Sequence, residues 1–419
     1  MSALPELSAV TQLSRYVTRI LGQNPSKFTL QGTNSYLVHH PSSPLLILLD
    51  TTGPSSSSPL PPSSYQAYLS NLRSAILSHP VQPARVTDII LTHWHGDHTE
   101  GLEGVVEMLS ELEGKEKGRE KMAVRVWKFP LQDDGGQAWR GEEGKDEAIE
   151  AFLDGVGEEL LRRIKGGRAV RLLEAGQKFR LEPVSSPSSG APGEEVVELE
   201  VVHTPGHTSD SVCLALSSSR TSSTSATSAT SATSATSATS ATSASSSATS
   251  STSHLLALFT ADTILGHSTA VFASLSHYLR SLSSLISLLS ASSADVPLYP
   301  GHGEVVEKGL EKVKEYKAHR EEREKQVVSA LREVKDGRSV TASELVDQIY
   351  GSTIPSSLKP AATHGLLLHL AKLEEERRVE REARAGEVKE EGMQGGGEVV
   401  VPKGWNDGWR WAGKGGESL

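Results

Sequence analysis

The sequence predicts an α/β protein in which two mixed sheets lie between layers of helices, with a helical appendage at the C-terminal end. Three observations predict this class: strand-like runs dominate the first 60 residues, strands and helices alternate through the middle, and only helical patterns follow residue 305. A sheet that buries one face against helices and the other against a second sheet gives this order of layers. The 419 residues are enough to bury a large core.

The individual elements follow from hydrophobic periodicity. Apolar runs between turn residues predict strands at 28–38, 44–53, 85–93, 122–129, 196–203, 211–216, 255–265 and 296–304. Apolar residues spaced by three and four, as at Tyr65, Leu69, Leu72 and Ile76, indicate helices. This spacing predicts helices at 65–76, 101–112, 274–289, 305–334, 341–351 and 358–379.

A low-complexity segment separates two of the strands. Residues 217–253 repeat Ser-Ala-Thr and carry no bulky apolar side chain, so burial cannot offset the entropy of ordering them and disorder is expected. Between two strands the segment predicts an enlarged hairpin loop, which costs little stability. We therefore expect a sandwich domain over 1–310, a helical appendage over 311–390, and a tail over 391–419 whose tryptophans dock onto the fold.

Composition limits the classes of function. The formal net charge of -10 and pI of about 5.9 disfavour a dedicated nucleic-acid binder, although a local basic groove is compatible with them. The single cysteine, Cys213, excludes a disulfide within the chain and fits a reducing, cytoplasmic location. An acid-poor N-terminus with two arginines also fits a mitochondrial address. No apolar run approaches the roughly 18 residues of a membrane-spanning helix.

Metal-binding side chains crowd the stretch LTHWHGDHTEG, directly after a predicted strand. His93, His95, Asp97 and His98 lie within six positions, and a tight loop can direct alternate side chains to one side. Nitrogen and carboxylate ligands without thiolate suit zinc, and also manganese or iron. A polar surface loop would explain one such histidine, but it is a poor explanation of four candidate ligands.

Three further candidates lie downstream, each on a loop at a strand end, where active-site residues usually occur. His207 stands in TPGHTSD, Asp262 in FTADTILG and His302 in YPGHGE. Together with the first cluster they supply enough ligands for two ions.

These motifs, in this order, resemble the metallo-β-lactamase superfamily, and the similarity runs from about residue 19 to 332. The resemblance implies an αββα sandwich. It implies that one ion is held by His93, His95 and His207, a second by Asp97, His98 and His302, and that Asp262 bridges them. His203 is not in a ligand position. Two residues stand where glycine is expected in many members, Glu100 and Ala261. Two ions of this kind imply hydrolysis, because a bound metal lowers the pKa of water from about 15.7 to about 7. Asp97 is expected to orient the attacking water.

Three stretches, 19–38, 262–279 and 316–327, resemble one branch of the superfamily. That branch holds thioesterases that release polyketides from fungal non-reducing synthases, and lactamase-like endoribonucleases of animals. The appendage is similar to the winged-helix-like appendage of this branch. For its role we favour covering the edge of the sandwich or forming a homodimer over recognising nucleic acid. The thioesterase resemblance implies a small-molecule acyl thioester as substrate and the acyl carrier protein domain of a polyketide synthase as partner.

We favour the thioester because the chain is acidic, because the low-complexity insertion suits a fungal source, and because a thiolate leaves with little acid assistance. The alternatives are cleavage of single-stranded RNA, hydrolysis of a glutathione thioester of the glyoxalase II type, and a metal-free scaffold that binds a synthase. The full ligand set argues against the scaffold. Asn34 and His267 are candidate substrate contacts; Asn34 capping a turn and His267 packing a loop are the alternatives.

Overall fold

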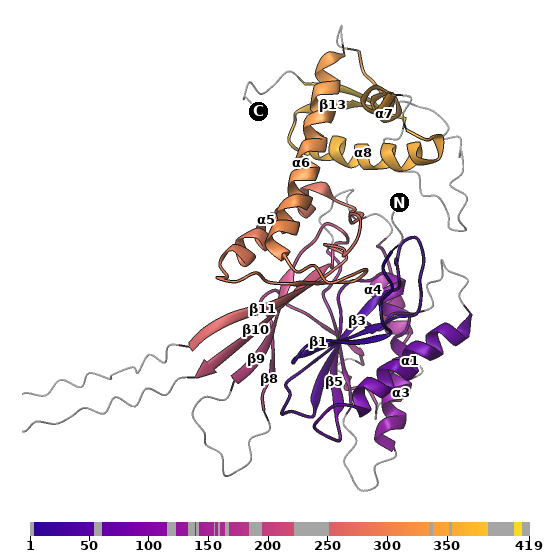
Figure 1. Cartoon of the computed structure of the whole chain (residues 1–419). Helices are drawn as coiled ribbons and strands as arrows, with labels where there is room; N and C mark the ends of the chain where they lie inside the picture. The colour runs from indigo at the N-terminus through magenta and orange to yellow at the C-terminus, as the bar shows by residue number, and fades with distance from the viewer. Residues whose placement is uncertain are drawn as a thin grey trace, which may run out of the picture.

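The computed structural model shows a two-sheet body from which one long helix leads to a smaller module (Figure 1). The residues that the structure describes are 4–53, 61–114, 123–132, 139, 142–154, 156–157, 160–163, 167–183, 195–221, 251–334, 338–351, 354–383 and 406–412. Within these ranges, none of the helices combines the length and the apolar character that crossing a bilayer requires.

The first sheet, as far as the chain is described, has seven strands in sequence order. They are β1 (Val10–Ser14), β2 (Val17–Leu21), β3 (Asn34–His39), β4 (Leu45–Leu49), β5 (Arg85–Leu91), β6 (Arg125–Lys128) and β7 (Val170–Leu172). The pairs from β1 to β4 are antiparallel, and those from β4 to β7 are parallel. The sheet is therefore mixed, as predicted.

The second sheet has the order β12-β11-β10-β9-β8 in the described part of the chain. Its strands are β8 (Lys178–Leu181), β9 (Glu195–His203), β10 (Val212–Thr221), β11 (Ser251–Ala261) and β12 (Leu298–Pro300). Only the β11–β12 pair among these is parallel. That pairing brings the end of β12 beside the end of β11, so the loops that follow both strands meet at one edge.

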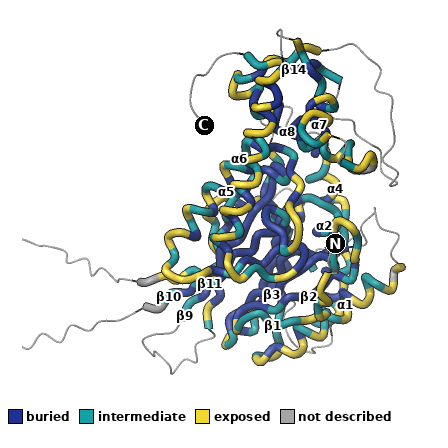
Figure 2. Tube along the Cα trace, turned by 45° about the horizontal axis from the view of Figure 1, so that its top comes forward, coloured by how far each residue is buried: buried dark blue, intermediate teal, exposed yellow. Residues whose placement is uncertain are grey.

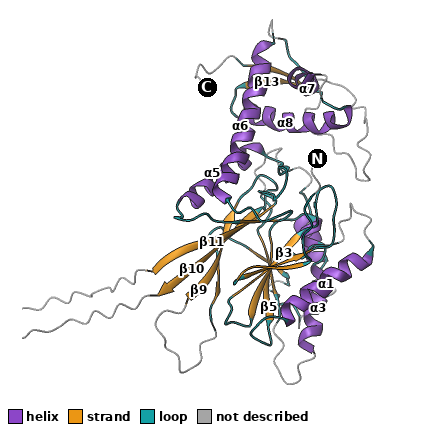
Figure 3. Ribbon diagram, viewed as in Figure 1, coloured by secondary structure: helices purple, strands orange, loops and turns teal. Residues whose placement is uncertain are grey.

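Alternating side chains sort the sheets into layers. In β5, Ile89 and Leu91 pack with the helices α1 (Pro62–Leu77) and α3 (Leu102–Gly114), whereas Ile90 faces the second sheet. The far side of the second sheet packs on α5 (Leu275–Ser290) and α6 (Gly309–Glu333). The order helix, sheet, sheet, helix confirms the predicted αββα sandwich (Figure 3), and the strands between the helices are the most buried part of the trace (Figure 2).

Helix α6 connects the sandwich to the appendage. Near its start Val313 and Tyr316 belong to the core beneath α5, and near its end Val327 and Leu331 belong to the core of the appendage. One continuous helix thus takes part in both cores. The other helices in the described residues are α2 (Gly96–Thr99), α4 (Lys145–Ala151), α7 (Ala342–Tyr350), the 3-10 turn η2 (Ser356–Leu358) and α8 (Lys359–Glu375).

The expectation of an all-helical C-terminal end was wrong. Strands β13 (Val379–Glu382) and β14 (Gly408–Trp411) pair antiparallel beside α7 and α8, and β14 comes from the predicted tail. The physical reason is the tryptophan anchor: Trp409 is 2% exposed and its backbone pairs with that of Val340. The predicted docking of the tail is therefore observed for Trp409, whereas Trp405 lies outside the described residues.

Two further boundaries differ from the prediction. The hairpin β1–β2 was not predicted, because its polar residues, such as the buried Arg19, obscure the alternation. Residues 217–221 and 251–253, expected to be disordered, form the ends of β10 and β11, where Ser217 pairs with Leu255 and Thr221 with Ser251. A two-stranded ladder satisfies their backbone groups without apolar side chains. The pairing supports the hairpin interpretation, and residues 222–250 lie outside the described residues.

Candidate metal centre

Side chains from both sheets converge at one edge of the sandwich. The loops after β5, β9, β11 and β12 carry all seven residues predicted as ligands. They form two groups, and within each group the candidate ligand atoms lie within 4.8 Å of one another: His93, His95, His207 and Asp262, and Asp97, His98 and His302. The same two sets, with Asp262 between them, are those implied by the resemblance. Their role as ligands remains a prediction that metal binding tests.

The short helix α2 explains how one motif serves two groups. β5 ends at Leu91, and His95 takes the N-cap position of α2. Asp97 and His98 therefore lie on a helical turn, whereas His93 and His95 lie on the extended segment before it. The change of backbone conformation directs the two pairs of side chains to different points.

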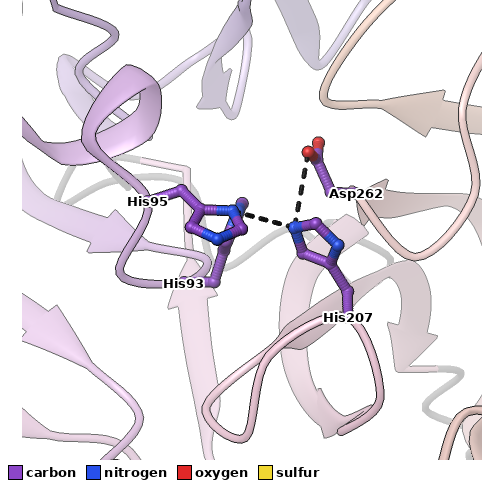
Figure 4. Close-up of side chains that lie close together, drawn as sticks. All are labelled: His93, His95, His207 and Asp262. Carbon is purple, nitrogen blue, oxygen red and sulfur yellow. Dashed lines mark hydrogen bonds and ion pairs between the residues drawn. The ribbon is translucent and has the colours of Figure 1, made fainter. Parts of the chain in front are cut away.

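The first group is built from three facing imidazoles (Figure 4). The Nδ1 atom of His95 lies 3.0 Å from Nε2 of His93 and 2.9 Å from Nε2 of His207. The Asp262 Oδ2 atom lies 3.6 Å from the same atom of His207. Three nitrogens and one carboxylate oxygen directed at a common point are a donor set that suits a divalent cation such as zinc.

The second group lies on the other side of Asp262. His98 Nε2 is 3.4 Å from His302 Nε2 and 3.5 Å from Asp97 Oδ2. The Asp262 Oδ1 atom lies 3.4 Å from His98 and 3.3 Å from His302, and this buried oxygen accepts no hydrogen bond. The two oxygens of Asp262 thus face different groups, which is the arrangement that a bridging ligand requires.

Two histidines of the first group are in the neutral form that binds a metal ion. Burial and then the neighbouring imidazoles lower the pKa of His93 well below its usual value, and lower that of His95 to about 3. Both rings are therefore neutral at pH 7 and offer a lone pair to a cation.

The second group has the opposite state. Burial disfavours protonation of His98 and His302, but the carboxylates of Asp97 and Asp262 outweigh it, so both pKa values rise, that of His302 to about 9. Burial likewise favours protonation of Asp97 and Asp262, yet the two histidines lower the pKa of each carboxyl. A divalent cation would replace these protons as the source of positive charge, so binding there should release protons.

A buried carboxylate that the sequence analysis missed orients His98. Asp50, at the end of β4, accepts hydrogen bonds from Nδ1 of His98 at 2.8 Å, from the Thr92 amide at 2.8 Å and from the Thr92 hydroxyl at 2.9 Å. This contact fixes Nδ1 as the donor and leaves Nε2 toward the second group. The sequence did contain a signal for this residue: Asp50 ends the apolar run LLILLD, and the predicted strand that precedes the histidines pairs with this run.

A second missed residue joins the two loops of the first group. Glu142 Oε1 accepts hydrogen bonds from the Trp94 indole at 3.2 Å and from the Ser209 amide at 3.0 Å. Trp94 lies between two predicted ligands, and Ser209 lies two residues after a third. The glycine-rich stretch around Glu142 has no periodicity, so the sequence offered no signal for it.

A buried ion pair supports the same loop. Lys128 Nζ lies 2.6 Å from Asp210 Oδ2 and 2.6 Å from Asp146 Oδ1, and the first two side chains are almost fully buried. The pair joins the end of β6 to the loop that carries His207. Removing one partner would leave an uncompensated buried charge.

The two predicted substrate contacts occupy different surroundings. Asn34 is 1% exposed, and its amide donates to the carbonyls of Pro300 and Gly303 at 2.9 Å each. These bonds brace the turn that carries His302, which favours the turn-capping alternative over substrate contact. His267 is exposed, and its backbone nitrogen lies beside Gly303 of the same turn.

The other sequence features have clear structural explanations. His203, the last residue of β9, donates from Nε2 to the Ser209 carbonyl and stacks on Phe129, away from both groups, as predicted. Ala261 has a φ of 44°, a left-handed conformation that favours glycine and explains the expectation of glycine there. The side chain of Glu100 fills the space above Gly96.

Comparison with known proteins identifies the matching families. The metallo-beta-lactamase superfamily profile matches residues 28–302, and the beta-lactamase associated winged helix domain profile matches residues 341–387. A beta-lactamase-like protein 2 homolog of Caenorhabditis elegans is 27% identical over 373 residues, which cover 89% of each chain. An atrochrysone carboxyl ACP thioesterase of Passalora fulva is 28% identical over 392 residues, which cover 93% of this chain and 84% of the relative.

The structural comparison agrees on the fold. The crystal structure of a beta-lactamase domain protein from Burkholderia ambifaria matches with a TM-score of 0.51 and 16% identity, covering 96% of this chain and 93% of that chain. This similarity extends over both the sandwich and the appendage.

Proposed function

Since the chain belongs to the metallo-β-lactamase superfamily and is a metal-dependent hydrolase, we propose that it is a thioesterase that releases an acyl or polyketide product from an acyl carrier protein. The observation that carries the proposal is the pair of ligand groups joined by Asp262, in a chain that an ACP thioesterase matches across both domains. The seven candidate ligands fit two zinc ions, with manganese or iron as alternatives.

The bound ions and the carboxylate of Asp97 have different roles in the proposed hydrolysis. When bound, the two ions polarise the substrate oxygen and lower the pKa of water. Asp97 is the most exposed of the carboxylates in the two groups, at 18% of its side chain against 13% for Asp262. Its Oδ2 atom accepts from the Thr33 hydroxyl at 3.3 Å, and we assign to this carboxylate the orientation of the attacking water.

The choice of a thioester follows from the leaving group. A thiolate leaves the carbonyl carbon without being protonated first. Thioester hydrolysis therefore needs no general acid beyond the residues of the two groups. An RNA phosphodiester would need protonation of its leaving oxygen and contacts to flanking phosphates. RNA cleavage, which the resemblance to lactamase-like endoribonucleases implies, is the second candidate. Hydrolysis of a glutathione thioester is a lesser one.

A paired assay tests the proposal. Metal-loaded protein is offered an acyl-phosphopantetheine thioester in one arm and a single-stranded RNA in the other, with Asp97→Ala as the control. We expect thioester hydrolysis that depends on Asp97, while circular dichroism shows an intact fold in the variant. RNA cleavage without thioester hydrolysis would refute the proposal, as would full activity of Asp97→Ala.

A further inference from the structure

Two arginines on α6 differ from the other basic residues around them. Neither Arg320 nor Arg323 forms an ion pair with any carboxylate in the described part of the chain, whereas the nearby Lys372 and Arg378 each pair with two glutamates. Both arginines are half-buried, and the Nε atom of Arg320 is buried without a hydrogen-bond partner. A partly desolvated positive charge without a counter-charge is costly, so an anion from outside the chain would stabilise this pair.

Part of each guanidinium edge is left without a partner. Arg320 Nη2 donates to the Ala270 carbonyl and Arg323 Nη1 donates to the exposed Gln326 side chain at 2.8 Å, whereas Arg320 Nη1 and the Nε and Nη2 atoms of Arg323 form no hydrogen bond with the described residues. Arg320 lies over the ring of Phe272 at 4.8 Å, and Arg323 lies over the ring of Tyr350 at 4.8 Å. Stacking occupies the faces of a guanidinium, whereas its N–H donors lie in the plane. Residues three apart on a helix are neighbours on one face, so the two groups can act on one anion. Planar, forked donors of this kind suit the oxygens of a phosphate.

The pair lies beside the candidate metal centre. Arg320 Nη2 donates to the Ala270 carbonyl at 2.9 Å, and the carbonyl of the next residue, Val271, is 2.7 Å from Nδ1 of His207. Between these two contacts the Val271 side chain is 63% exposed, although it is apolar. From the arginines toward the centre, the surface therefore offers two cations, then an apolar side chain, then the ligand groups.

We propose that Arg320 and Arg323 bind the phosphate of the phosphopantetheine arm that carries the acyl group. The inference rests on the proposed thioesterase function and adds a subsite to it. The arm has a phosphate at one end, a chain with amide and methylene groups, and the thioester at the other. This order matches the order of cations, apolar side chain and ligand groups along the surface. Arg320 also holds the loop of Val271, so Arg323 is the better residue for a test.

The test compares substrates with and without the phosphate. Hydrolysis of an acyl-phosphopantetheine thioester and of the matching acyl-pantetheine thioester is measured for the wild type, Arg323→Gln and Arg332→Gln. Arg332 is the matched control, because it lies on the same helix, also stacks on an aromatic ring (Trp411 at 4.6 Å), and belongs to the distant end of α6. The preference is the ratio of the two kcat/KM values.

We expect the wild type to prefer the phosphorylated substrate, and Arg323→Gln to reduce that preference about 10- to 100-fold, which is the loss of one charge-assisted contact. Arg323→Gln should leave kcat/KM for acyl-pantetheine unchanged, and Arg332→Gln should change neither value. An equal loss on both substrates would show that Arg323 is only structural and would overturn the inference. Absence of a phosphate preference in the wild type would also overturn it.

Binding of the free thiol separates this inference from the proposed function. Calorimetry with phosphopantetheine and pantetheine reports the phosphate contact without any hydrolysis. If the wild type hydrolyses neither thioester but binds phosphopantetheine more tightly in an Arg323-dependent way, the phosphate subsite stands and the thioesterase proposal fails. If Arg323 instead supports binding of an RNA oligonucleotide and phosphopantetheine does not bind, the subsite proposal is wrong.

Discussion

Replacing Asp50 with asparagine tests whether the carboxylate behind His98 controls the second group. In the protein, Asp50 Oδ2 accepts from both His98 Nδ1 and the Thr92 hydroxyl, while Oδ1 accepts from the Thr92 amide. An asparagine keeps one acceptor oxygen and replaces the other with an NH2 group, which cannot accept a hydrogen bond. If the NH2 group faces His98, a neutral His98 carries its proton on Nε2, the atom that faces Asp97 and Asp262. If the oxygen faces His98, the NH2 group meets the Thr92 amide, so either orientation loses part of the support of His98.

The expected loss of metal affinity and of stability follows from these contacts. Loss of such an orienting partner weakens metal binding about 10- to 100-fold, or about 1.4 to 2.7 kcal/mol at the second group. In the metal-free protein, the lost hydrogen bonds to a charged acceptor should lower the free energy of unfolding by about 1.5 to 3 kcal/mol. Among the described residues, Asp50 has no direct contact with the first group and reaches it only through the Thr92 hydroxyl, which lies 3.1 Å from His93 Nδ1, so the affinity of that group should change less.

Elemental analysis after dialysis and titration with a chromophoric chelator measure metal content and affinity, and urea titration of the metal-free protein measures the free energy of unfolding. We expect two ions per chain in the wild type and one tightly bound ion in Asp50→Asn. The matched control is Asp88→Asn, because Asp88 is equally buried on β5 and accepts from Arg125 and Trp127. This control should lower stability without changing metal content. Two tightly bound ions in Asp50→Asn, or equal metal loss in both variants, would refute the reasoning.

Four further outcomes are expected. Glu142→Ala should weaken metal binding at the first group about 10-fold, whereas Glu142→Gln, which keeps an acceptor oxygen, should retain the affinity in the same chelator titration. Replacing 222–250 with Asn-Gly should leave turnover unchanged, because the end pairs of β10 and β11 remain; removing 217–253 deletes those pairs and should lower the melting temperature. Burial, and then nearby basic side chains, lower the pKa of His369 from 6.5 to about 3, so the unfolded chain binds a proton that the folded chain excludes. Stability should therefore fall as the pH drops from 6.5 toward 3, and His369→Leu should reduce this loss by about 2 kcal/mol at pH 5 in urea titrations. Truncation after Val334 should raise KM and lower the melting temperature while metal content is retained.

The sequence predicted the parts of the fold that depend on local periodicity. In β5, the run from Ile89 to Leu91 was assigned to a buried strand because both of its faces are apolar, and the structure places those faces in two different cores. The candidate ligands were found for a similar reason: residues able to bind metal stand directly after apolar runs. Their grouping came from the family resemblance, since spacing alone does not tell which loops meet.

The parts that were missed depend on pairs of residues distant in sequence. The Lys128–Asp210 ion pair and the Glu142 bridge join segments whose sequences carry no periodic signal. β14 is four residues long and pairs across a long interval with β13, whose sequence VERE is mostly charged. Each of these contacts depends on which distant segments the fold brings together, and the hydrophobic pattern of a single segment does not predict that.

The long helix explains why the appendage matters to a centre built entirely from the sandwich. The loop after Asp262 is held by α6: the Tyr316 hydroxyl donates to the Ser268 carbonyl at 2.8 Å, and Arg320 donates to that of Ala270. The same loop accepts from His207. Because the far half of α6 lies in the core of the appendage, loss of that core would expose its apolar residues and fray the helix toward Tyr316. The appendage therefore supports the loop that contacts His207, even though none of the seven candidate ligands comes from it.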